Sequence, residues 1–384
     1  MNHVIPYGKH HISQKDIDAV VETLESDFLT QGPQIENFEK AFAKYVEADF
    51  AIAVSNGTSA LHLCSLALGA NKYSRVITSP ITFVASANCI EYCGGKIEFC
   101  DIDPETLCLD INKVKNKLEN SPKGTYSGII PVDFAGFPVN MEAFRNLADQ
   151  YGLWLLEDSC HAPGGFFYDS LMKKQLCGNG RFADTAIFSF HPVKHIAAGE
   201  GGMITTNRED LYNRIKRLRT HGISKSPDLL TKSSQSWYYE MQELGYNYRI
   251  SDISCALGNS QLKRAKEGLK DRKVIAKKYL QDLSSLPLKI PSANFSDGHA
   301  FHLFVILTDK RDKLYSYLRE WNIQTQIHYI PIYKQPYFES KYGSQHLKFT
   351  EEYFSKCLSL PIYPSMTKEE YLYVIEKITK FYNA

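Results

Sequence analysis

The chain has 384 residues, of which 43% are hydrophobic, enough to bury the cores of two domains. Lysine and arginine together number 44 and aspartate and glutamate 43, so the chain has no long-range field that would attract nucleic acid or an anionic membrane. The nine cysteines show no Cys-x-x-Cys spacing, which argues against a disulfide framework or a zinc site and favours a reducing cytoplasm. No stretch has the pattern of a secretory signal or the length of a membrane span, so we expect a soluble, cytoplasmic protein.

Two amphipathic helices are predicted near the amino terminus. From about residue 11 to 25 apolar residues follow helical spacing, and Ser13 can cap the amino end. The turn residues at 28–33 end this pattern. A second helix is then predicted through Phe38, Phe42 and Tyr45. The opening segment, before the first helix, forms an arm.

After residue 50, short apolar runs alternate with helical segments. Runs at 51–55, 76–78 and 128–132 are each followed by a helical pattern, the run at 153–157 is continuously apolar, and further strands are predicted at 185–190 and 203–206. This alternation predicts an α/β fold with a mostly parallel sheet and helices on both faces. Ligands of such sheets bind beyond the carboxyl ends of the strands, so the residues that follow each run are the candidates for a site.

A second, smaller domain is predicted at the carboxyl end. A basic helical stretch at about 259–278 leads out of the sheet domain, followed by a strand at 301–307 and helices near 313–321 and 368–382. We therefore expect an amino-terminal arm and large domain over residues 1–260 and a small α+β domain over residues 261–384.

Three segments at predicted strand ends could bind a ligand. The segment 56–59, Asn-Gly-Thr-Ser, opens a helix whose free amides favour a phosphate, although a plain capped helix start has the same pattern. Asp158 follows a buried strand and needs a cation or several hydrogen bonds there, unless it caps a turn, and His161 could reach the same ligand. Phe83 could stack on a flat ring or pack in the core.

Lys194 completes this set of candidates. It ends the segment Ser-Phe-His-Pro-Val-Lys at 189–194 and precedes the glycine-rich residues 199–202. A lysine among small and hydroxyl residues after an apolar strand is poorly solvated and can become an amine nucleophile, whereas most lysines are solvated surface charges. A phosphate site, a stacking face, a buried carboxylate and a reactive lysine are together what pyridoxal phosphate requires.

Over nearly its full length the chain resembles the DegT/DnrJ/EryC1/StrS family of sugar aminotransferases. The resemblance implies the fold type I architecture of pyridoxal phosphate enzymes, which is that of aspartate aminotransferase. The matching segments are Ser-Asn-Gly-Thr-Ser-Ala-Leu at 55–61, Thr-Phe-Val-Ala at 82–85, Glu-Asp-Ser-Cys-His-Ala at 157–162, Ser-Phe-His-Pro-Val-Lys at 189–194, Glu-Gly-Gly at 200–202, Arg-Thr-His-Gly at 219–222 and Gly-Tyr-Asn-Tyr-Arg-Ile-Ser-Asp at 245–252.

The resemblance implies a role for each candidate residue. Lys194 would hold pyridoxal phosphate and then move the substrate proton, Asp158 would keep the pyridine nitrogen protonated, and His161 would lie near the phenolic oxygen. The other cofactor contacts would be Phe83 on the ring and Gly57, Thr58, Ser189 and Asn247 on the phosphate. Asn247 would come from the neighbouring subunit, which makes a homodimer with a shared active site obligatory, and no metal is implied.

Within the family the chain is most similar to aminotransferases that move an amino group from L-glutamate to the C4 keto group of a UDP-linked 4-keto-6-deoxy-N-acetylhexosamine in pseudaminic acid biosynthesis. The segments that indicate this are 27–32 and 326–333. Sugar contacts would then come from Tyr7, Asp27, Phe28, Leu29, Thr30, Gln326, Ile327, His328 and Tyr329.

Other functions remain open at this point. The substrate could be another nucleotide-linked keto sugar, as in enzymes of the GDP-perosamine or TDP-amino sugar type. A sugar dehydratase of the same family is disfavoured because such members carry histidine in place of the lysine, and a nucleotide-dependent oxidoreductase is disfavoured because no glycine fingerprint follows a strand. Arg249 could meet a substrate anion or form an interface salt bridge, and the segment 167–180 departs from the family pattern.

Overall fold

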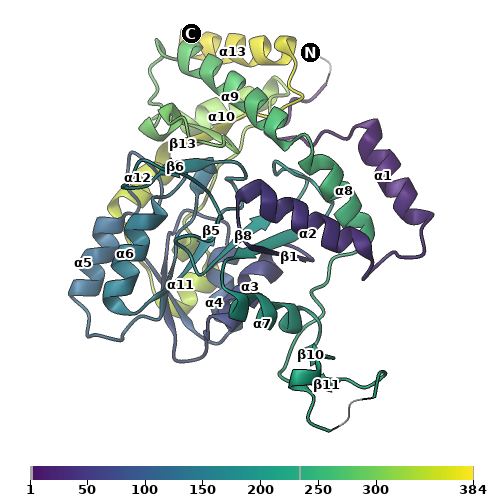
Figure 1. Ribbon diagram of the computed structural model, residues 1–384. Helices are drawn as coiled ribbons and strands as arrows, with labels where there is room; N and C mark the ends of the chain where they lie inside the picture. Colours follow the sequence, from purple (N-terminus) through teal and green to yellow (C-terminus); the bar gives the residue numbers. More distant parts are fainter. Residues whose placement is uncertain (1–2, 233–234, 384) are drawn as a thin grey trace.

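A seven-stranded sheet forms the centre of the molecule in the computed structural model, which describes residues 3–232 and 235–383 (Figure 1). Its order is β1-β9-β8-β5-β4-β2-β3, and only β9 runs antiparallel to its neighbours, so the predicted mostly parallel sheet is confirmed. The strands are β1 (Phe50–Val54), β2 (Arg75–Thr78), β3 (Lys96–Phe99), β4 (Gly128–Ile130), β5 (Trp154–Asp158), β8 (Thr185–Ser189) and β9 (Gly202–Thr206).

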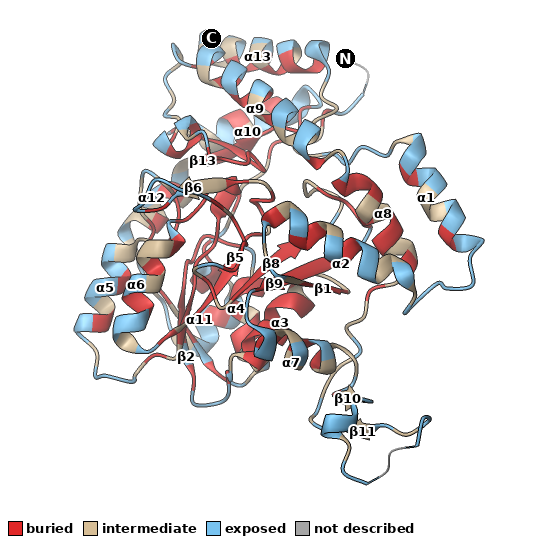
Figure 2. Cartoon of the chain, viewed as in Figure 1, coloured by how far each residue is buried: buried red, intermediate tan, exposed pale blue. Residues whose placement is uncertain are grey.

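Helices cover both faces of the sheet because strand residues point alternately to either side. In β1, Ile52 and Val54 join the core under the helices of one face, whereas Ala51 and Ala53 pack with Phe38 of the other face. Figure 2 shows the buried strands between helices that are exposed on their outer sides. The first face carries α3 (Gly57–Ala67), α4 (Ala85–Tyr92) and α7 (Glu209–Arg219), and the second carries α2 (Pro33–Val46), α5 (Ile111–Glu119) and α6 (Met141–Tyr151).

The carboxy-terminal part forms a core of its own around a two-stranded antiparallel sheet. The predicted strand and its two helices are present, and the predicted basic helix is two helices, α8 and α9, that meet at Lys263 and Arg264. The proposed domain boundary between residues 260 and 261 falls inside α8 and stays a prediction. The elements are α8 (Asp252–Leu262), α9 (Ala265–Asp282), β12 (Phe304–Leu307), α10 (Arg311–Glu320), α11 (Pro336–Tyr342), α12 (Lys348–Lys356), β13 (Cys357–Leu360) and α13 (Lys368–Asn383).

The amino-terminal helix α1 (Gln14–Leu24) packs against α8 and stands at the edge of the molecule in Figure 1. Ser13 donates its backbone N–H to the Asp16 carboxylate at 2.7 Å, which fixes the start of the helix as the sequence predicts. Two hairpins were not predicted, namely β6 (Phe166–Tyr168) with β7 (Lys174–Leu176) and β10 (Ile223–Ser224) with β11 (Glu240–Met241).

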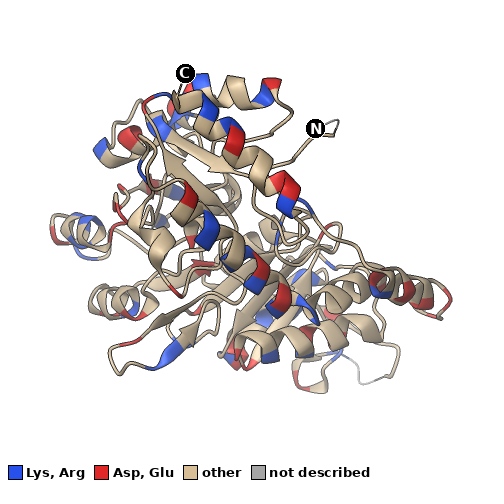
Figure 3. Cartoon of the chain, turned by 90° about the horizontal axis from the view of Figure 1, so that it is seen from above, with Lys and Arg blue, Asp and Glu red and all other residues tan. Residues whose placement is uncertain are grey.

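Charges of both signs are interspersed in the view of Figure 3, in line with the near balance of the composition. Among the helices of residues 3–232 and 235–383, none combines the length and the apolar character needed to cross a membrane.

Candidate active site

The carboxyl ends of β1, β5 and β8 lie at one edge of the sheet. β1 and β8 run in the same direction because each is antiparallel to β9, which lies between them. Asn56, Asp158 and Ser189, which end or follow these three strands, therefore meet at that edge. This is the position at which open α/β sheets bind ligands.

An anion cradle lies at the amino end of α3. Asn56 caps the helix, its side-chain oxygen accepting from the Ser59 backbone N–H at 2.8 Å. Gly57 faces Ser189 so closely that an added Cβ would lie 3.1 Å from the Ser189 Cβ, and a Cβ on Gly202 would lie 2.5 Å from the Asn56 carbonyl oxygen. The first turn contains no acidic residue, so its free amides, with the half-buried side chain of Thr58 beside them, suit a phosphate.

Asp158 is a buried carboxylate with neutral hydrogen-bond donors. Its Oδ2 accepts from the Ser86 hydroxyl at 2.7 Å, and its Oδ1 accepts from the Cys160 backbone N–H at 3.2 Å. No cation among the described residues forms an ion pair with it. The carboxylate thus retains the capacity to bind a cationic group of a ligand.

Lys194 lies beyond β8, half-buried, in the loop that leads to β9. Within the described part of the chain its ammonium has neither a hydrogen bond nor an ion pair, although the charges of Cys160 and Asp158 act on it. Loss of solvation lowers the pKa of Lys194, and the attraction to Cys160 and Asp158 opposes this only in part. A lowered pKa increases the fraction of neutral amine, which is the nucleophilic form.

His161 is buried beside these residues and is neutral. Its Nε2 shares a hydrogen bond of 3.3 Å with the Tyr329 hydroxyl, whereas its Nδ1 is buried and finds no partner in the described part of the chain. Burial lowers the pKa of His161 well below its usual range, and the neighbouring positive charge of Lys194 lowers it further. Lys194 therefore lies near both Asp158 and His161 in the structure, and the catalytic roles of the three residues stay predictions.

Part of the predicted sugar-binding set lies around the same group. Tyr7 and His328 have ring centroids 5.2 Å apart, and His328 shares a hydrogen bond of 2.9 Å with Ser359 through its Nδ1. Tyr329 links this set to His161 and to Phe83, whose ring centroid lies 6.4 Å away. Phe83 is 57% exposed and precedes α4, so its ring is free to cover a ligand. Gln326 and Ile327, which precede His328 and Tyr329 in the chain, are half-buried, and Gln326 pairs with Ser359 of β13.

The other residues predicted to bind the sugar or the phosphate, 27–30 and Asn247, do not lie near Lys194 of the same chain. Residues 27–30 are exposed, and their backbone contacts are with the start of α8, where the Leu29 carbonyl accepts from the Asp252 N–H at 3.0 Å. Thr30 pairs with Ser251, and the exposed Asn247 pairs with Thr220. Asp27, Phe28, Leu29, Thr30 and Asn247 thus lie outside the group around Lys194 in the single chain.

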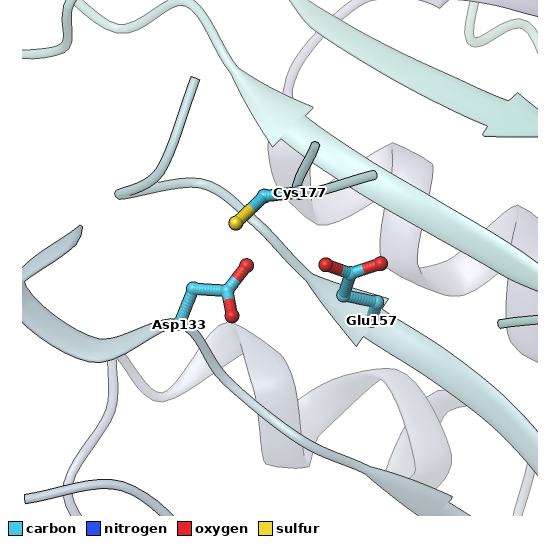
Figure 4. Close-up of side chains that lie close together, drawn as sticks. All are labelled: Asp133, Glu157 and Cys177. Carbon is cyan, nitrogen blue, oxygen red and sulfur yellow. The ribbon is translucent and has the colours of Figure 1, made fainter. Parts of the chain in front are cut away.

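A buried acid pair lies close to Asp158 in the sequence and the sheet: Glu157 precedes Asp158 in β5, and Asp133 follows the end of β4. The side chains of Asp133, Glu157 and Cys177 point toward one another in Figure 4. Ser159 lies between the two carboxylates, with its hydroxyl 2.7 Å from Asp133 Oδ2 and 3.0 Å from Glu157 Oε1. Burial raises the pKa of both acids, that of Asp133 to about 6, so the two groups hold a proton that isolated acids would lose.

Two further residues of the site were not predicted from the sequence. Ser86 donates to Asp158 from 72 positions away, and His302 lies with its ring centroid 4.3 Å from that of His161. Their sequence signals are slight, a hydroxyl one position after Ala85 of the Thr-Phe-Val-Ala motif and a histidine just before an apolar strand.

The chain is similar to known proteins over almost its entire length. The model of the DegT/DnrJ/EryC1/StrS aminotransferase family matches residues 10–379. The spore coat polysaccharide biosynthesis protein SpsC of Bacillus subtilis is 38% identical over 387 residues, covering 98% of this chain and 97% of the relative. The UDP-4-amino-4,6-dideoxy-N-acetyl-beta-L-altrosamine transaminase of Campylobacter jejuni (strain 81-176) is 34% identical over 392 residues, covering 99% of this chain and 100% of the relative.

Among solved structures, Helicobacter pylori PseC, an aminotransferase involved in the biosynthesis of pseudoaminic acid, superposes with a TM-score of 0.88 at 29% identity and covers 99% of both chains. The predicted fold class, that of pyridoxal phosphate aminotransferases, is confirmed. The match to the family model spans almost the entire sequence and includes the group around Lys194. The chain belongs to the DegT/DnrJ/EryC1/StrS aminotransferase family and is a transaminase.

Proposed function

We propose that this transaminase uses pyridoxal phosphate to move an amino group from L-glutamate to the C4 keto group of a UDP-linked 4-keto-6-deoxy-N-acetylhexosamine. One observation carries the proposal: Lys194 and Asp158 lie at the same sheet edge as the anion cradle formed by Gly57 and Ser189. Neither Lys194 nor Asp158 has an ionic partner among the described residues, so both are available to a ligand. The substrate rests on the similarity to the Campylobacter jejuni transaminase and to PseC.

The residues present fit the cofactor. Bound there, pyridoxal phosphate would supply a ring that withdraws electrons from the substrate α carbon. The cradle at Gly57, Thr58 and Ser189 would hold the phosphate, and the buried Asp158 would keep a proton on the ring nitrogen, because its own donors are neutral.

Lys194 would have two tasks. Its amine, made more nucleophilic by a lowered pKa, would bind the cofactor covalently. Once displaced, it would move a proton from the donor α carbon to the cofactor in one half-reaction and from the cofactor to the sugar C4 in the other. His161, neutral and oriented by Tyr329, would face the phenolic oxygen, and Phe83 would cover the ring. Together these side chains would exclude water from the reacting atoms.

The complete site would be built by two chains. Asn247 is exposed and lies outside the group around Lys194, as expected of a residue that contacts the phosphate in a partner subunit. The exposed apolar residues Phe28 and Leu29 support the same conclusion for the segment 27–30. Sugar contacts would come from this segment and from Tyr7 and residues 326–329.

Reduction with borohydride tests the cofactor proposal. Protein reconstituted with pyridoxal phosphate, reduced and digested should carry the cofactor mass on the peptide that contains Lys194. Lys194→Ala should lose both this adduct and glutamate-dependent transfer, whereas the exposed control Lys263→Ala should keep both. Wild-type protein that binds no cofactor would refute the proposal.

The substrate is tested separately with UDP-, GDP- and TDP-linked 4-keto-6-deoxy sugars. Release of 2-oxoglutarate and the mass of the aminated sugar should be seen with the UDP-linked N-acetylhexosamine. Reaction with only a GDP- or TDP-linked sugar would overturn the substrate but leave the transaminase intact. Loss of a hydroxyl without gain of nitrogen would indicate a dehydratase.

A further inference from the structure

His302, which precedes β12, packs its ring against the site histidine. The ring centroids of His302 and His161 are 4.3 Å apart with an interplanar angle of 34°, and the two residues are 5% and 4% exposed. His195, next to Lys194 in the chain, has its ring centroid 5.8 Å from that of His302. Three imidazoles thus lie in a row beside Lys194.

The backbone around Gly136 makes this contact possible. The residues on either side of His302 are bound to the turn that contains Gly136, with the Ala300 N–H donating to the Gly136 carbonyl at 2.8 Å and the Leu303 N–H donating to the Ala135 carbonyl at 3.1 Å. Gly136 has a φ of +101°, and a Cβ there would lie 2.9 Å from the His161 carbonyl oxygen and 3.0 Å from the His302 nitrogen. Only glycine lets the two histidine segments approach so closely.

Arg272 of α9 fixes the same segment from the other side. The residue is 1% exposed, and its Nη1 donates to the carbonyls of Phe301, His302 and Ile362 at 3.2, 3.3 and 2.9 Å. No carboxylate among the described residues pairs with it. The Arg272 cation therefore holds the His302 backbone, and its positive charge also disfavours protonation of the His302 ring.

The surroundings of His302 keep it neutral. Burial lowers the pKa of His302 well below its usual range, and the positive charges of Lys194 and Arg272 lower it further. The Nδ1 atoms of both His302 and His161 are buried and have no hydrogen-bond partner among residues 3–232 and 235–383. A proton gained by either ring would create a positive charge that neither water nor a hydrogen-bond acceptor at Nδ1 stabilises, so both rings stay neutral.

We propose that His302 is a positioning residue for the transfer reaction, which stacks on His161 and holds that imidazole uncharged and in one orientation. The inference rests on the proposed function, because His161 matters only if it faces the bound cofactor. With one side packed on His302 and its Nε2 bonded to Tyr329, the His161 ring cannot turn without losing both contacts. His302 thereby sets the charge and the orientation of the His161 ring that faces the cofactor, without itself contacting the cofactor.

The test compares three variants reconstituted with pyridoxal phosphate. His302→Leu removes the ring, His302→Phe keeps a ring without nitrogen, and His299→Leu removes a buried histidine of the same segment whose ring stacks on Phe301 instead. The readout is the pH midpoint of the absorption change of the bound cofactor, supported by kcat and KM for glutamate. Thermal unfolding shows which variants are folded, and His302→Gln replaces the leucine variant if that one does not fold.

The inference predicts that His302→Leu lowers the pH midpoint of the cofactor's absorption change by about half a pH unit or more. Without the His302 ring, His161 can gain a positive charge, and that charge disfavours the protonated form of the bound cofactor. Its kcat should fall about tenfold with an unchanged KM, and His302→Phe should restore the wild-type midpoint. An unchanged midpoint in the folded variant, or an equal change in His299→Leu, would overturn the inference. Wild-type protein that binds no pyridoxal phosphate would instead refute the proposed function.

Discussion

Ser86 donates its hydroxyl to Asp158 at 2.7 Å in a fully buried pair. Ser86→Ala would remove one of the two hydrogen bonds that the described residues donate to this carboxylate and leave a buried oxygen unsatisfied, at a cost of about 1–3 kcal/mol. We expect the free energy of unfolding in urea to fall by about that amount, and kcat to fall about tenfold while the cofactor is still bound. Ser65→Ala is the control, because Ser65 is equally buried and donates to the Leu61 carbonyl rather than to Asp158. Equal kcat losses in both variants would contradict a role for Ser86 at Asp158.

Gly57→Ala should weaken binding of the phosphate group. The new Cβ would lie 3.1 Å from the Ser189 Cβ and narrow the cradle at the start of α3. We expect the affinity for pyridoxal phosphate to fall about tenfold, measured by equilibrium dialysis, since a lost phosphate contact of about 1.4 kcal/mol has this effect. The affinity for pyridoxal, which lacks the phosphate, should not change. A parallel loss for both ligands would place the phosphate elsewhere.

The Asp133 and Glu157 pair should make stability depend on pH. Burial raises the pKa of Asp133 from 3.8 to about 6, so between these values the folded chain holds a proton that the unfolded chain has released. The contribution to stability is therefore full below the unfolded pKa and is lost as pH rises to about 6, with a slope of at most about 1.4 kcal/mol per unit.

Asp133→Asn should reduce this slope by the contribution of Asp133, leaving that of the buried Glu157, and urea unfolding between pH 4 and 7 would measure the change. The matched control is Asp271→Asn, because Asp271 is exposed on α9. The prediction fails if wild type and Asp133→Asn lose stability in parallel over this range.

Gly136→Ala should separate the two histidine segments. A Cβ at a φ of +101°, 2.9 Å from the His161 carbonyl oxygen, adds a steric clash to backbone strain, and we expect a loss of about 2 kcal/mol or more. Gly152→Ala is the control, because Gly152 also has a positive φ, of +67°, but an added Cβ meets no atom within 4 Å. Its cost should be about 1 kcal/mol. Unfolding in urea compares the two, and equal losses would show that the close approach is unimportant.

The strand ends that form the site could be predicted from the sequence because each follows an apolar run. Asn56 and Asp158 lie at the ends of β1 and β5 and Lys194 lies in the loop after β8, and helices α3, α4 and α6 follow the runs at 51–55, 76–78 and 128–132 as expected. Periodicity is a local property, so it is readable without knowledge of the fold. The roles of these residues stay proposals.

Contacts between distant segments could not be predicted in this way. Ser86 reaches Asp158 across 72 residues, and His302 meets His161 only because the turn at Gly136 binds the segment before β12. Neither contact leaves a periodic pattern. The reversed direction of β9 is likewise set by its pairing with β1 and β8 rather than by its composition.

That reversed strand has a consequence for Lys194. β8 and β9 pair through Ser189 and Gly202, and Phe190 continues the pairing into the loop by bonding Gly201 and Ala198. The lysine therefore lies in a loop whose two ends are clamped together by the sheet. The conformational entropy of this loop is given up once, when the chain folds, so little orientational freedom is left for the lysine to lose at each turnover.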